Sequence, residues 1–492
     1  MNQNLFCLFS EQASAQSAAP ALICGDGQTL SYGDLRRLAG QFTAELNARA
    51  VQPGDRVVVQ VEKSVAAIAL YLACAQAGAI FVPLNTAYTD AEVDYFLNDA
   101  QPALFVHDPA RMAPWPSSAA LGTSADSPLW RDALAREPVS EIEPRTREDI
   151  AAICYTSGTT GRSKGAMITH GNMVSNAHSL IELWRFTADD VLLHILPIFH
   201  VHGLFVATHC ALFSGAAMLF EPGFDIDRVL TLLPRASVMM GVPTHYTRLL
   251  AEPRFGQGQT AAMRLFISGS APLLAETHRD FELRTGHRIL ERYGMSEAGM
   301  ILSNPYDGER VAGTVGFTLP GVSARVRSEE EKTVENGDVG VLEIKGPNVF
   351  SGYWQMPDKT AESFTDDGWF ITGDLVTCDA AGRHSIVGRA KDLIIAGGYN
   401  IYPKEIEAVL DELPGVLESA VVGIPHPDFG ETVVAVIVPQ TGHSVQEEDA
   451  QTLVNEQLAR FKHPRIYHFV EELPRNAMGK VQKAELRRRF GG

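Results

Sequence analysis

The sequence predicts an α/β protein with a large N-terminal domain of parallel-rich sheets covered by helices and a small α+β C-terminal domain. Two observations predict the large domain: short apolar runs alternate with longer helical patterns, and these runs are apolar at nearly every position. Strands of that kind are buried on both faces, as in a parallel sheet between layers of helices. A third observation, a change of pattern near residue 388, predicts domains over residues 1–388 and 389–492.

The alternation of strands and helices begins near residue 55. The run "DRVVVQVE" over 55–62 predicts a strand, and the segment 65–78 predicts a helix that ends at Gly78. The segment 115–128 is polar and rich in small residues, so we expect a surface loop there. Further strands are expected over residues 79–85, 103–108, 191–199, 216–222, 237–243 and 263–270.

The small domain shows a different pattern. Turn-forming residues cluster after residue 388, and "YPKEIEAVLDEL" then starts a helix with Pro403 in its first turn, where proline is favoured. A short mixed pattern follows, with strands expected over 419–425, 432–439 and 467–473 and a helix over 449–461. This segment is long enough to form a domain of its own.

Charge limits the partners of the protein. The 492 residues include 41 basic and 59 acidic side chains, a net charge of −18. This balance argues against nonspecific binding to nucleic acid or to an anionic membrane. An anionic substrate must therefore be held by a local group of basic side chains, because the overall field repels it.

Cysteine use and the N-terminus favour a cytoplasmic location. The six cysteines form no C-x-x-C pair and are expected to be small hydrophobic residues in a reducing compartment. The first twelve residues lack Lys and Arg before a short apolar patch, so they make a poor signal peptide. The apolar stretch 66–84 is interrupted by Gly78 and Pro83, which favours a buried helix and strand over a membrane span.

The segment "YTSGTTGRSKG" (155–165) is rich in glycine and hydroxyl residues and includes Lys164. Glycine lets the backbone approach an anion closely, so successive N–H groups can point at a phosphate. The spacing differs from G-x-x-x-x-G-K-[ST], however, and by composition alone a plain surface loop is the more common outcome. Composition therefore leaves both interpretations open.

The longer string "YTSGTTGRSKGAMITHGN" resembles the phosphate-binding signature of the adenylate-forming superfamily: acyl- and aryl-CoA synthetases, adenylation domains and firefly-type luciferases. The resemblance implies that a carboxylate attacks the α-phosphate of ATP, and that a thiol, expected to be coenzyme A, then displaces AMP. It also implies Mg²⁺ and a mobile small domain. Six more stretches resemble family motifs in order: "FHVHG" (199–203), "GSAP" (269–272), "ERYGMSEAG" (291–299), "WFITGDL" (369–375), "GRAKDLIIAGGYNIYPKEIE" (388–407) and "PRNAMGKVQK" (474–483).

The resemblance implies three groups of ATP-binding residues. Donors around the leaving pyrophosphate neutralise charge, an apolar slot with an aromatic wall holds adenine, and one carboxylate accepts from both ribose hydroxyls. Position 296 is Ser where the family more often has Thr, but either hydroxyl can contact phosphate. The residues are Thr156, Ser157, Gly158, Thr159, Thr160 and Lys164 at the phosphates; Gly269, Ser270, Ala271 and Tyr293 at the adenine; and Asp374 and Arg389 at the ribose and phosphate. The resemblance also assigns Glu291, Arg292, Gly294, Met295, Ser296 and Lys480 to ATP binding.

Other roles also follow from the resemblance. Glu297, with Thr156, is the expected Mg²⁺ site, since a hard cation prefers oxygen ligands. Lys480 is expected to stabilise charge at the α-phosphorus, and a lysine acetyltransferase acting on Lys480 would remove that charge. Lys391 is the expected hinge. The residues expected to line the coenzyme A tunnel are Gly397, Gly398 and Tyr399.

The acid site is expected to include a cation for a second carboxylate. Arg248 follows the turn in "MGVPTHYTRLL", and arginine pairs with carboxylates bidentately; Arg279 is the competing candidate. Without the resemblance, Arg248 is equally well explained as a solvated arginine on the surface of a helix. The segments around this site most resemble malonyl-CoA synthetases, which implies malonate as substrate. Other residues expected at the acid are His200, which is also a catalytic candidate, Val201, Ser270 and Met300.

Three alternatives stay open. The chain could activate another short acid, such as methylmalonate, oxalate or a small monoacid, or it could load a carrier-protein thiol instead of coenzyme A. It could also be a degenerate nucleotide-binding regulator. The presence of Glu297, Asp374, Arg389 and Lys480 argues against the last alternative.

Overall fold

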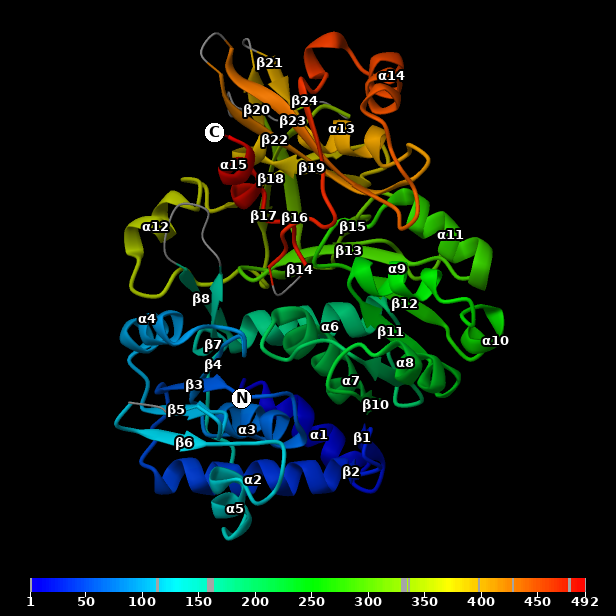
Figure 1. Cartoon of the computed structure of the whole chain (residues 1–492). Coiled ribbons are helices and arrows are strands. Elements are labelled where there is room, and N and C mark those ends of the chain that lie inside the picture. The colour runs from blue at the N-terminus through cyan, green and yellow to red at the C-terminus, as the bar shows by residue number, and fades with distance from the viewer. Residues whose placement is uncertain are drawn as a thin grey trace.

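The protein is seen in a computed structural model that describes residues 2–111, 115–156, 163–328, 334, 337–396, 399–426, 429–476 and 479–491. Within these residues the strands form four sheets, of nine, six, four and five strands. Figure 1 shows the five-stranded sheet at one end of the molecule and the six-stranded sheet towards the other. The predicted α/β fold is confirmed.

The nine-stranded sheet has a parallel centre. Its central strands β1, β10, β9, β11, β12 and β13 run parallel. Strands β2 and β14 flank them in the antiparallel direction, and β15 pairs antiparallel with β14 at the outer edge. The bounds are β1 Pro20–Cys24, β2 Thr29–Ser31, β9 Val191–His194, β10 Ala217–Phe220, β11 Val238–Gly241, β12 Leu265–Ser268, β13 Leu290–Met295, β14 Gly299–Ser303 and β15 Phe317–Thr318. Its helices are α7 His209–Ser214, α8 Ile226–Leu232, α9 Pro243–Ala251, α10 Gln257–Thr260 and α11 Ala275–Thr285.

The six-stranded sheet has the order β6-β5-β3-β4-β7-β8, with only the β7–β8 pair antiparallel. One prediction here is wrong, because β6 lies within the expected surface loop 115–128. The bounds are β3 Arg56–Gln60, β4 Ile80–Pro83, β5 Leu104–His107, β6 Ser118–Ala120, β7 Ile150–Thr156 and β8 Lys164–Thr169, with helices α1 Phe6–Ala15, α2 Tyr32–Ala48, α3 Val65–Gln76, α4 Asp90–Ala100, α5 Pro128–Leu134 and α6 His170–Leu183.

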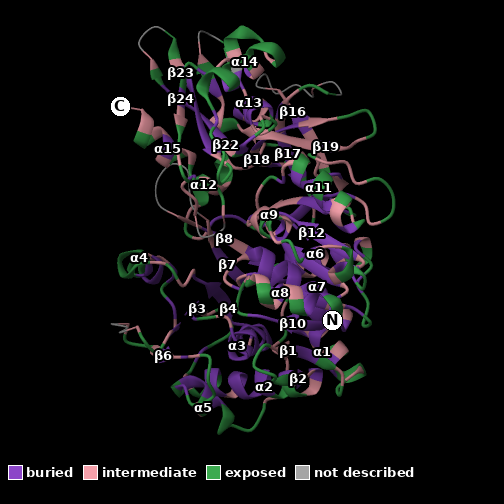
Figure 2. Cartoon of the chain, turned by 45° about the vertical axis from the view of Figure 1, so that its right-hand side comes forward, coloured by how far each residue is buried: buried purple, intermediate pink, exposed green. Residues whose placement is uncertain are grey.

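Helices α3 and α6 hold the two large sheets together. Every residue of α3 is buried, as expected for a helix that is apolar on all faces (Figure 2). Helix α6 starts with a capping box from Thr169 and packs against both β8 and β14. Its packing places the end of β8, which carries Lys164, beside the nine-stranded sheet.

The remaining sheets are antiparallel or mixed. Strands β16 Ser323–Arg327, β17 Gly340–Lys345, β18 Phe370–Cys378 and β19 His384–Arg389 form an antiparallel sheet that the sequence analysis did not identify. Helix α12 Pro357–Glu362 lies between β17 and β18 in the chain. The five-stranded sheet contains β20 Ile394–Ala396, β21 Tyr399–Ile401, β22 Val416–His426, β23 Gly430–Pro439 and β24 Ile466–Phe469, with helices α13 Pro403–Leu410, α14 Glu447–Gln457 and α15 Lys483–Phe490.

The five-stranded sheet has a hydrophobic cluster on each face. One contains Ile406 and Leu410 of α13 and Val454 of α14, and the other contains Leu486 of α15. The helix with Pro403 in its first turn and the strands expected in this region are confirmed. The division of the chain at residue 388 stays a prediction, as does the hinge at Lys391, which lies in the short 3₁₀ turn Ala390–Asp392.

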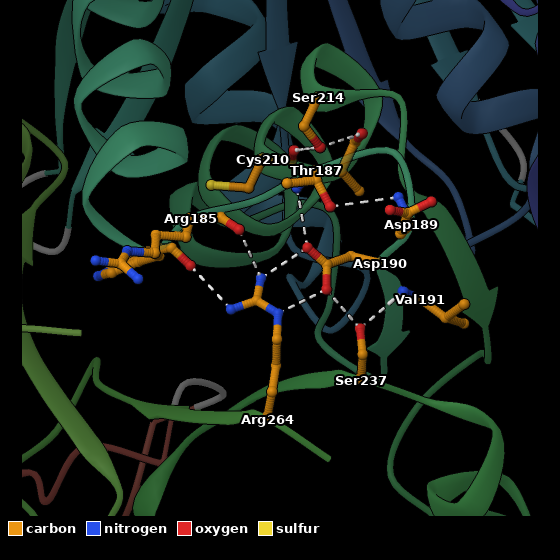
Figure 3. A network of polar contacts seen from close by, with 11 residues as sticks. Arg185, Thr187, Asp189, Asp190, Val191, Cys210, Ser214, Ser237 and Arg264 are labelled. Carbon is orange, nitrogen blue, oxygen red and sulfur yellow. Dashed lines mark hydrogen bonds and ion pairs between the residues drawn. The ribbon is translucent and has the colours of Figure 1, made fainter. Parts of the chain in front are cut away.

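A polar network ties together the amino ends of three central strands (Figure 3). Arg264, just before β12, donates from Nε and Nη2 to the two carboxylate oxygens of Asp190, at 2.7 Å each. Ser237, just before β11, donates to the same carboxylate at 2.7 Å, and its Oγ accepts from the N–H of Val191 at 2.9 Å. The network therefore fixes β9, β11 and β12 at the edge opposite their carboxyl ends.

We expect Asp190→Asn to lower the free energy of unfolding by about 2–4 kcal/mol, because it leaves part of the Arg264 guanidinium unpaired. Burial raises the pKa of Asp190, but the bonds from Arg264, Ser237 and the backbone outweigh burial, so the pKa lies below its usual value. The stabilisation is thus present above the ordinary carboxyl pKa and is lost as pH falls through the folded-state pKa. Urea unfolding at several pH values measures it. The exposed neighbour Asp189→Asn is the control, and equal midpoints for the two variants would contradict the prediction.

No helix in the described ranges has both the length and the apolar character needed to span a bilayer.

Candidate active site

The candidate site lies at the carboxyl edge of the nine-stranded sheet. Strands β9, β11, β12 and β13 are parallel, so their carboxyl ends meet at one edge, where open α/β sheets commonly bind ligands. The segments that follow β9 and β12 carry His200 and Ser270. The residues predicted for ATP on β18 and β19, and Lys480 from the small domain, face the same edge.

Asp374 and Arg389 form a pair on adjacent strands. They are register partners in β18 and β19, and Arg389 Nε lies 2.9 Å from Asp374 Oδ1. Tyr293, from the end of β13, donates its hydroxyl to the other carboxylate oxygen. Asp374 itself is buried. The arrangement holds the Asp374 carboxylate in a fixed position beside an aromatic ring, where it could accept from ribose hydroxyls.

Glu297 lies beside Tyr353 and Lys164. The Tyr353 hydroxyl donates to Glu297 Oε1 at 3.1 Å, and Lys164 Nζ lies 4.3 Å from the centre of the Tyr353 ring. Burial raises the pKa of Glu297, while Tyr353, Arg389 and Lys164 act in the opposite direction. Thr156 is paired with Lys164 across the β7–β8 hairpin. A buried carboxylate whose ionised form is disfavoured by desolvation is suited to a divalent cation.

The residues fit a magnesium ion held mainly by substrate. In the ranges that the structure describes, no group of three or more His, Cys, Asp or Glu side chains could hold a metal. Mg²⁺ commonly uses one or two carboxylates together with phosphate oxygens and water. Glu297 would supply the carboxylate, and the charge of the bound cation would neutralise the phosphates.

Lys480 connects the small domain to the site. Its backbone N–H donates to Asn476 Oδ1 at 3.0 Å, and its carbonyl accepts from Asn476 N–H at 2.9 Å, which closes a tight loop. Burial and the charge of Arg389 lower the pKa of Lys480, and Asp374 and Glu297 oppose them. Lys480 is exposed, and its amine lies close enough to these charged side chains for its pKa to respond to them. Its amine therefore lies among the residues predicted for the ribose and the metal.

The acid cluster comprises His200, His202, Ser270 and Arg292. His202 N–H donates to His200 Nδ1 at 3.3 Å, and His202 Nδ1 lies 3.1 Å from Ser270 Oγ. Burial, with the charges of Lys480 and Arg292, lowers the pKa of His200 to about 3, so the ring is neutral. Because Nδ1 accepts, Nε2 of His200 carries the proton and can donate to a carboxylate oxygen.

Arg292 is the cation of this cluster. It is buried on β13, and within the described structure its Nε and Nη2 have no hydrogen-bond partner. Its guanidinium packs on Gly269, where a Cβ would lie 2.3 Å from Cζ. Burial lowers the pKa of Arg292 to about 9. A buried guanidinium without a partner is costly, and a carboxylate would satisfy it.

Arg248 and Arg279, the two predicted partners of a second carboxylate, stay predictions, and the structure adds Arg292 as a third candidate. Arg248 on α9 is exposed and lies 5.9 Å from the centre of the Phe224 ring, and Arg279 on α11 is also exposed. A cation in a site closed to water was expected, and the role of either arginine stays a prediction, because in this structure neither meets that condition. Arg292, which the resemblance assigned to ATP, does. The alternation of side chains along a strand could have indicated this, because Arg292 and Tyr293 are neighbours in β13 and must point to opposite faces of the sheet.

The other predicted residues fall into four groups. Glu291 turns away from the nucleotide residues, because its Oε1 accepts from Gly313 N–H at 3.2 Å and lies 3.6 Å from His278 Nδ1. Tyr399 is 56% exposed and stacks on Phe461. Buried or half-buried near the ends of β9, β12, β13 and β14 are Val201, Ala271, Gly294, Met295, Ser296 and Met300. Outside the described residues lie Ser157, Gly158, Thr159, Thr160, Gly397 and Gly398.

Comparison with known proteins gives consistent matches along the chain. A family model described as AMP-binding enzyme matches residues 9–354, and one described as AMP-binding enzyme C-terminal domain matches residues 405–480. A feruloyl-CoA synthase of Amycolatopsis sp is 35% identical over 94% of this chain and 95% of its own. A malonate–CoA ligase of Arabidopsis thaliana is 34% identical over 98% of this chain and 87% of its own.

Solved structures include a similar protein in two states. The crystal structure of ATP-bound MatB from Rhodopseudomonas palustris has 51% identity, covers 100% of this chain and 99% of its own, and superposes with a TM-score of 0.97. For the apo form, at the same identity and coverage, the TM-score is 0.86. The arrangement described above is thus more similar to the ATP-bound form.

Proposed function

Because the chain belongs to the AMP-binding enzyme family, we propose that it is an AMP-forming acid–CoA ligase that converts malonate, ATP and coenzyme A into malonyl-CoA, AMP and pyrophosphate. In the first step, one malonate carboxylate oxygen attacks the α-phosphorus, and the bond to pyrophosphate breaks. In the second, the coenzyme A sulfur attacks the carbonyl carbon of malonyl-adenylate, AMP leaves, and the thiol proton is released.

Each group of residues in the site has its own role in the first step. Asp374 and Arg389 bind the ribose and a phosphate of ATP. Lys164 lies at the end of the hairpin whose loop resembles a phosphate-binding signature. Glu297 would supply the carboxylate ligand for Mg²⁺. Lys480 stabilises the charge that builds at the α-phosphorus, because a compact ammonium is a strong point charge. Neutral His200 donates from Nε2 and orients the attacking carboxylate.

Malonate is supported by one observation above all: buried Arg292 has unpaired N–H groups beside His200 and His202. One carboxylate must reach phosphorus, and the other needs a cation. An acid without a second carboxylate would leave Arg292 without a partner. The similarity to a malonate–CoA ligase and to MatB agrees with this assignment.

An acid panel tests the proposal. Malonate, methylmalonate, oxalate, acetate, propionate and ferulate are supplied with ATP and Mg²⁺, with and without coenzyme A, and AMP and pyrophosphate are measured. Malonate should give the highest kcat/KM, with AMP release dependent on coenzyme A. Preference for a monoacid would overturn malonate as the substrate. Pyrophosphate release without any response to coenzyme A would favour a carrier-protein thiol.

We also propose that residues 389–492 turn about Lys391 between the two steps, bringing Tyr399 towards the coenzyme A site. Lys391→Pro should leave adenylate formation largely intact and lower malonyl-CoA synthesis by at least about tenfold, because proline fixes φ near −65°. Pyrophosphate release and thioester formation are measured separately, and Lys391→Ala is the control. Equal losses in both steps would contradict the hinge and indicate a folding defect.

The proposal also includes a cellular location and a modification of Lys480. We infer a cytoplasmic location from the cysteine pattern, and we infer that a lysine acetyltransferase acts on Lys480. Acetylation would remove the charge that the first step uses.

A further inference from the structure

A π-helix follows directly after His200 and Val201. It spans His202–Thr208, and π-turns are uncommon and frequent at functional sites. The turn before it is tightly folded: a Cβ at Gly203 would lie 1.9 Å from the carbonyl oxygen of Pro197, so only glycine fits. The position of His200 therefore depends on what holds this turn.

Two side chains hold the Gly203 carbonyl oxygen. His194 Nε2 lies 3.0 Å from it, and Thr208 Oγ1 donates to it at 2.9 Å. A carbonyl can only accept, so Nε2 of His194 must carry a proton. His194 is buried, and burial together with the charge of Lys63 places its pKa well below the usual value. The ring is neutral, and its Nδ1 is an acceptor.

Lys63 provides the donor for Nδ1. Its Nζ lies 2.8 Å from His194 Nδ1 and donates to the His194 carbonyl at 2.9 Å, so it holds the side chain and backbone together. The amine also lies 4.4 Å from the centre of the Phe220 ring. Burial lowers the pKa of Lys63 well below its usual value, with Glu221 acting in the opposite direction, and the amine can donate whether charged or neutral. Lys63 follows β3 of the six-stranded sheet, whereas His194 ends β9 of the other large sheet.

We propose that Lys63 and His194 are positioning residues for acid activation. They fix the tautomer that binds the Gly203 carbonyl, hold the start of the π-helix, and so present His200 and Val201 to the acid without touching it. Leu204 N–H donates to the His200 carbonyl at 2.9 Å, which couples the helix directly to that residue. This inference rests on the proposed function of the acid cluster.

The test uses four variants of the full-length protein. Lys63→Met removes the donor at similar length, His194→Leu removes both ring nitrogens, and His194→Gln keeps a donor and an acceptor. Lys359→Met is the control, because that lysine is exposed and pairs with Glu362. Acid-dependent pyrophosphate release gives KM and kcat for malonate and for ATP, and hydrogen exchange reports the amides of residues 196–209.

We expect Lys63→Met and His194→Leu to lower kcat/KM for malonate by about 10- to 100-fold while KM for ATP stays within about twofold, since small misplacements of a catalytic group have effects of this size. His194→Gln should recover part of the loss. Exchange over residues 196–209 should accelerate in Lys63→Met and stay unchanged in Lys359→Met.

Three results would overturn the inference: malonate kinetics within twofold of wild type, His194→Gln no better than His194→Leu, or unchanged exchange over 196–209 in Lys63→Met. Wild-type protein that makes no adenylate from any acid would overturn the proposed function instead. The exchange result still decides whether Lys63 holds the π-helix, so the two failures are distinguishable.

Discussion

Replacing Lys480 with alanine should lower malonate-dependent pyrophosphate release by about 1,000-fold, the upper range for loss of one charge-stabilising group. The amine lies among Asp374, Glu297, Arg389 and Arg292, where the α-phosphate of ATP would be bound. The second step should be nearly unchanged, because it begins from a finished adenylate. Thioester formation from supplied malonyl-adenylate should therefore stay within about twofold of wild type.

The control for Lys480→Ala is Arg488→Ala, an exposed cation of the same domain on α15. It should change neither step. If Lys480→Ala releases pyrophosphate normally, the lysine has no role in adenylation. If both steps fall together, damage to the loop that includes Asn476 is the better explanation.

The second large effect is expected at Arg292. Leaving a buried carboxylate without its cationic partner typically costs about 2–5 kcal/mol. Because 1.4 kcal/mol is a factor of ten, Arg292→Leu should lower kcat/KM for malonate by about 30- to several-thousand-fold. Acetate and propionate bring no second charge, so their turnover should be maintained or should rise. Arg292→Lys should recover only part of the loss, since it keeps the charge but not the planar fork.

Parallel substitutions decide between the three arginines. Arg248→Leu and Arg279→Leu are measured with the same acids, and both should behave as wild type because both side chains are exposed. Thermal unfolding checks that Arg292→Leu folds. A large malonate-specific loss in Arg248→Leu, with none in Arg292→Leu, would restore Arg248 as the partner of the second carboxylate.

Much of the fold and of the ATP site could be predicted from the sequence because their signals are local. Buried parallel strands are apolar runs, and a helix start such as Pro403 is marked by its own residue type. The strings that include Asp374, Glu297 and Lys480 are long enough to be specific. In the structure, Asp374 and Glu297 lie close enough to Lys480 to affect its pKa, although the three residues lie far apart in the chain.

The features of the structure that the sequence did not predict depend on contacts between distant segments. No local pattern shows that Lys63 meets His194, or that Arg292 packs on Gly269, because the members of each pair come from different segments of the chain. The exposure of Arg248 has the same origin: an arginine on a helix is buried or exposed according to what the rest of the chain places beside it. Strand β6 was missed because an edge strand of three residues carries little apolar signal.

The Asp190–Arg264 network has a consequence for how this enzyme can be altered. It lies at the amino ends of β9, β11 and β12, while the acid cluster lies beyond their carboxyl ends, and four-residue strands separate the two edges by roughly 10 Å or more. Effects of changes at that separation generally add. Redesigning an acid site usually lowers stability, so a library aimed at bulkier acids can begin from variants reinforced at the amino edge. Its members would then tolerate substitutions that unfold the natural chain.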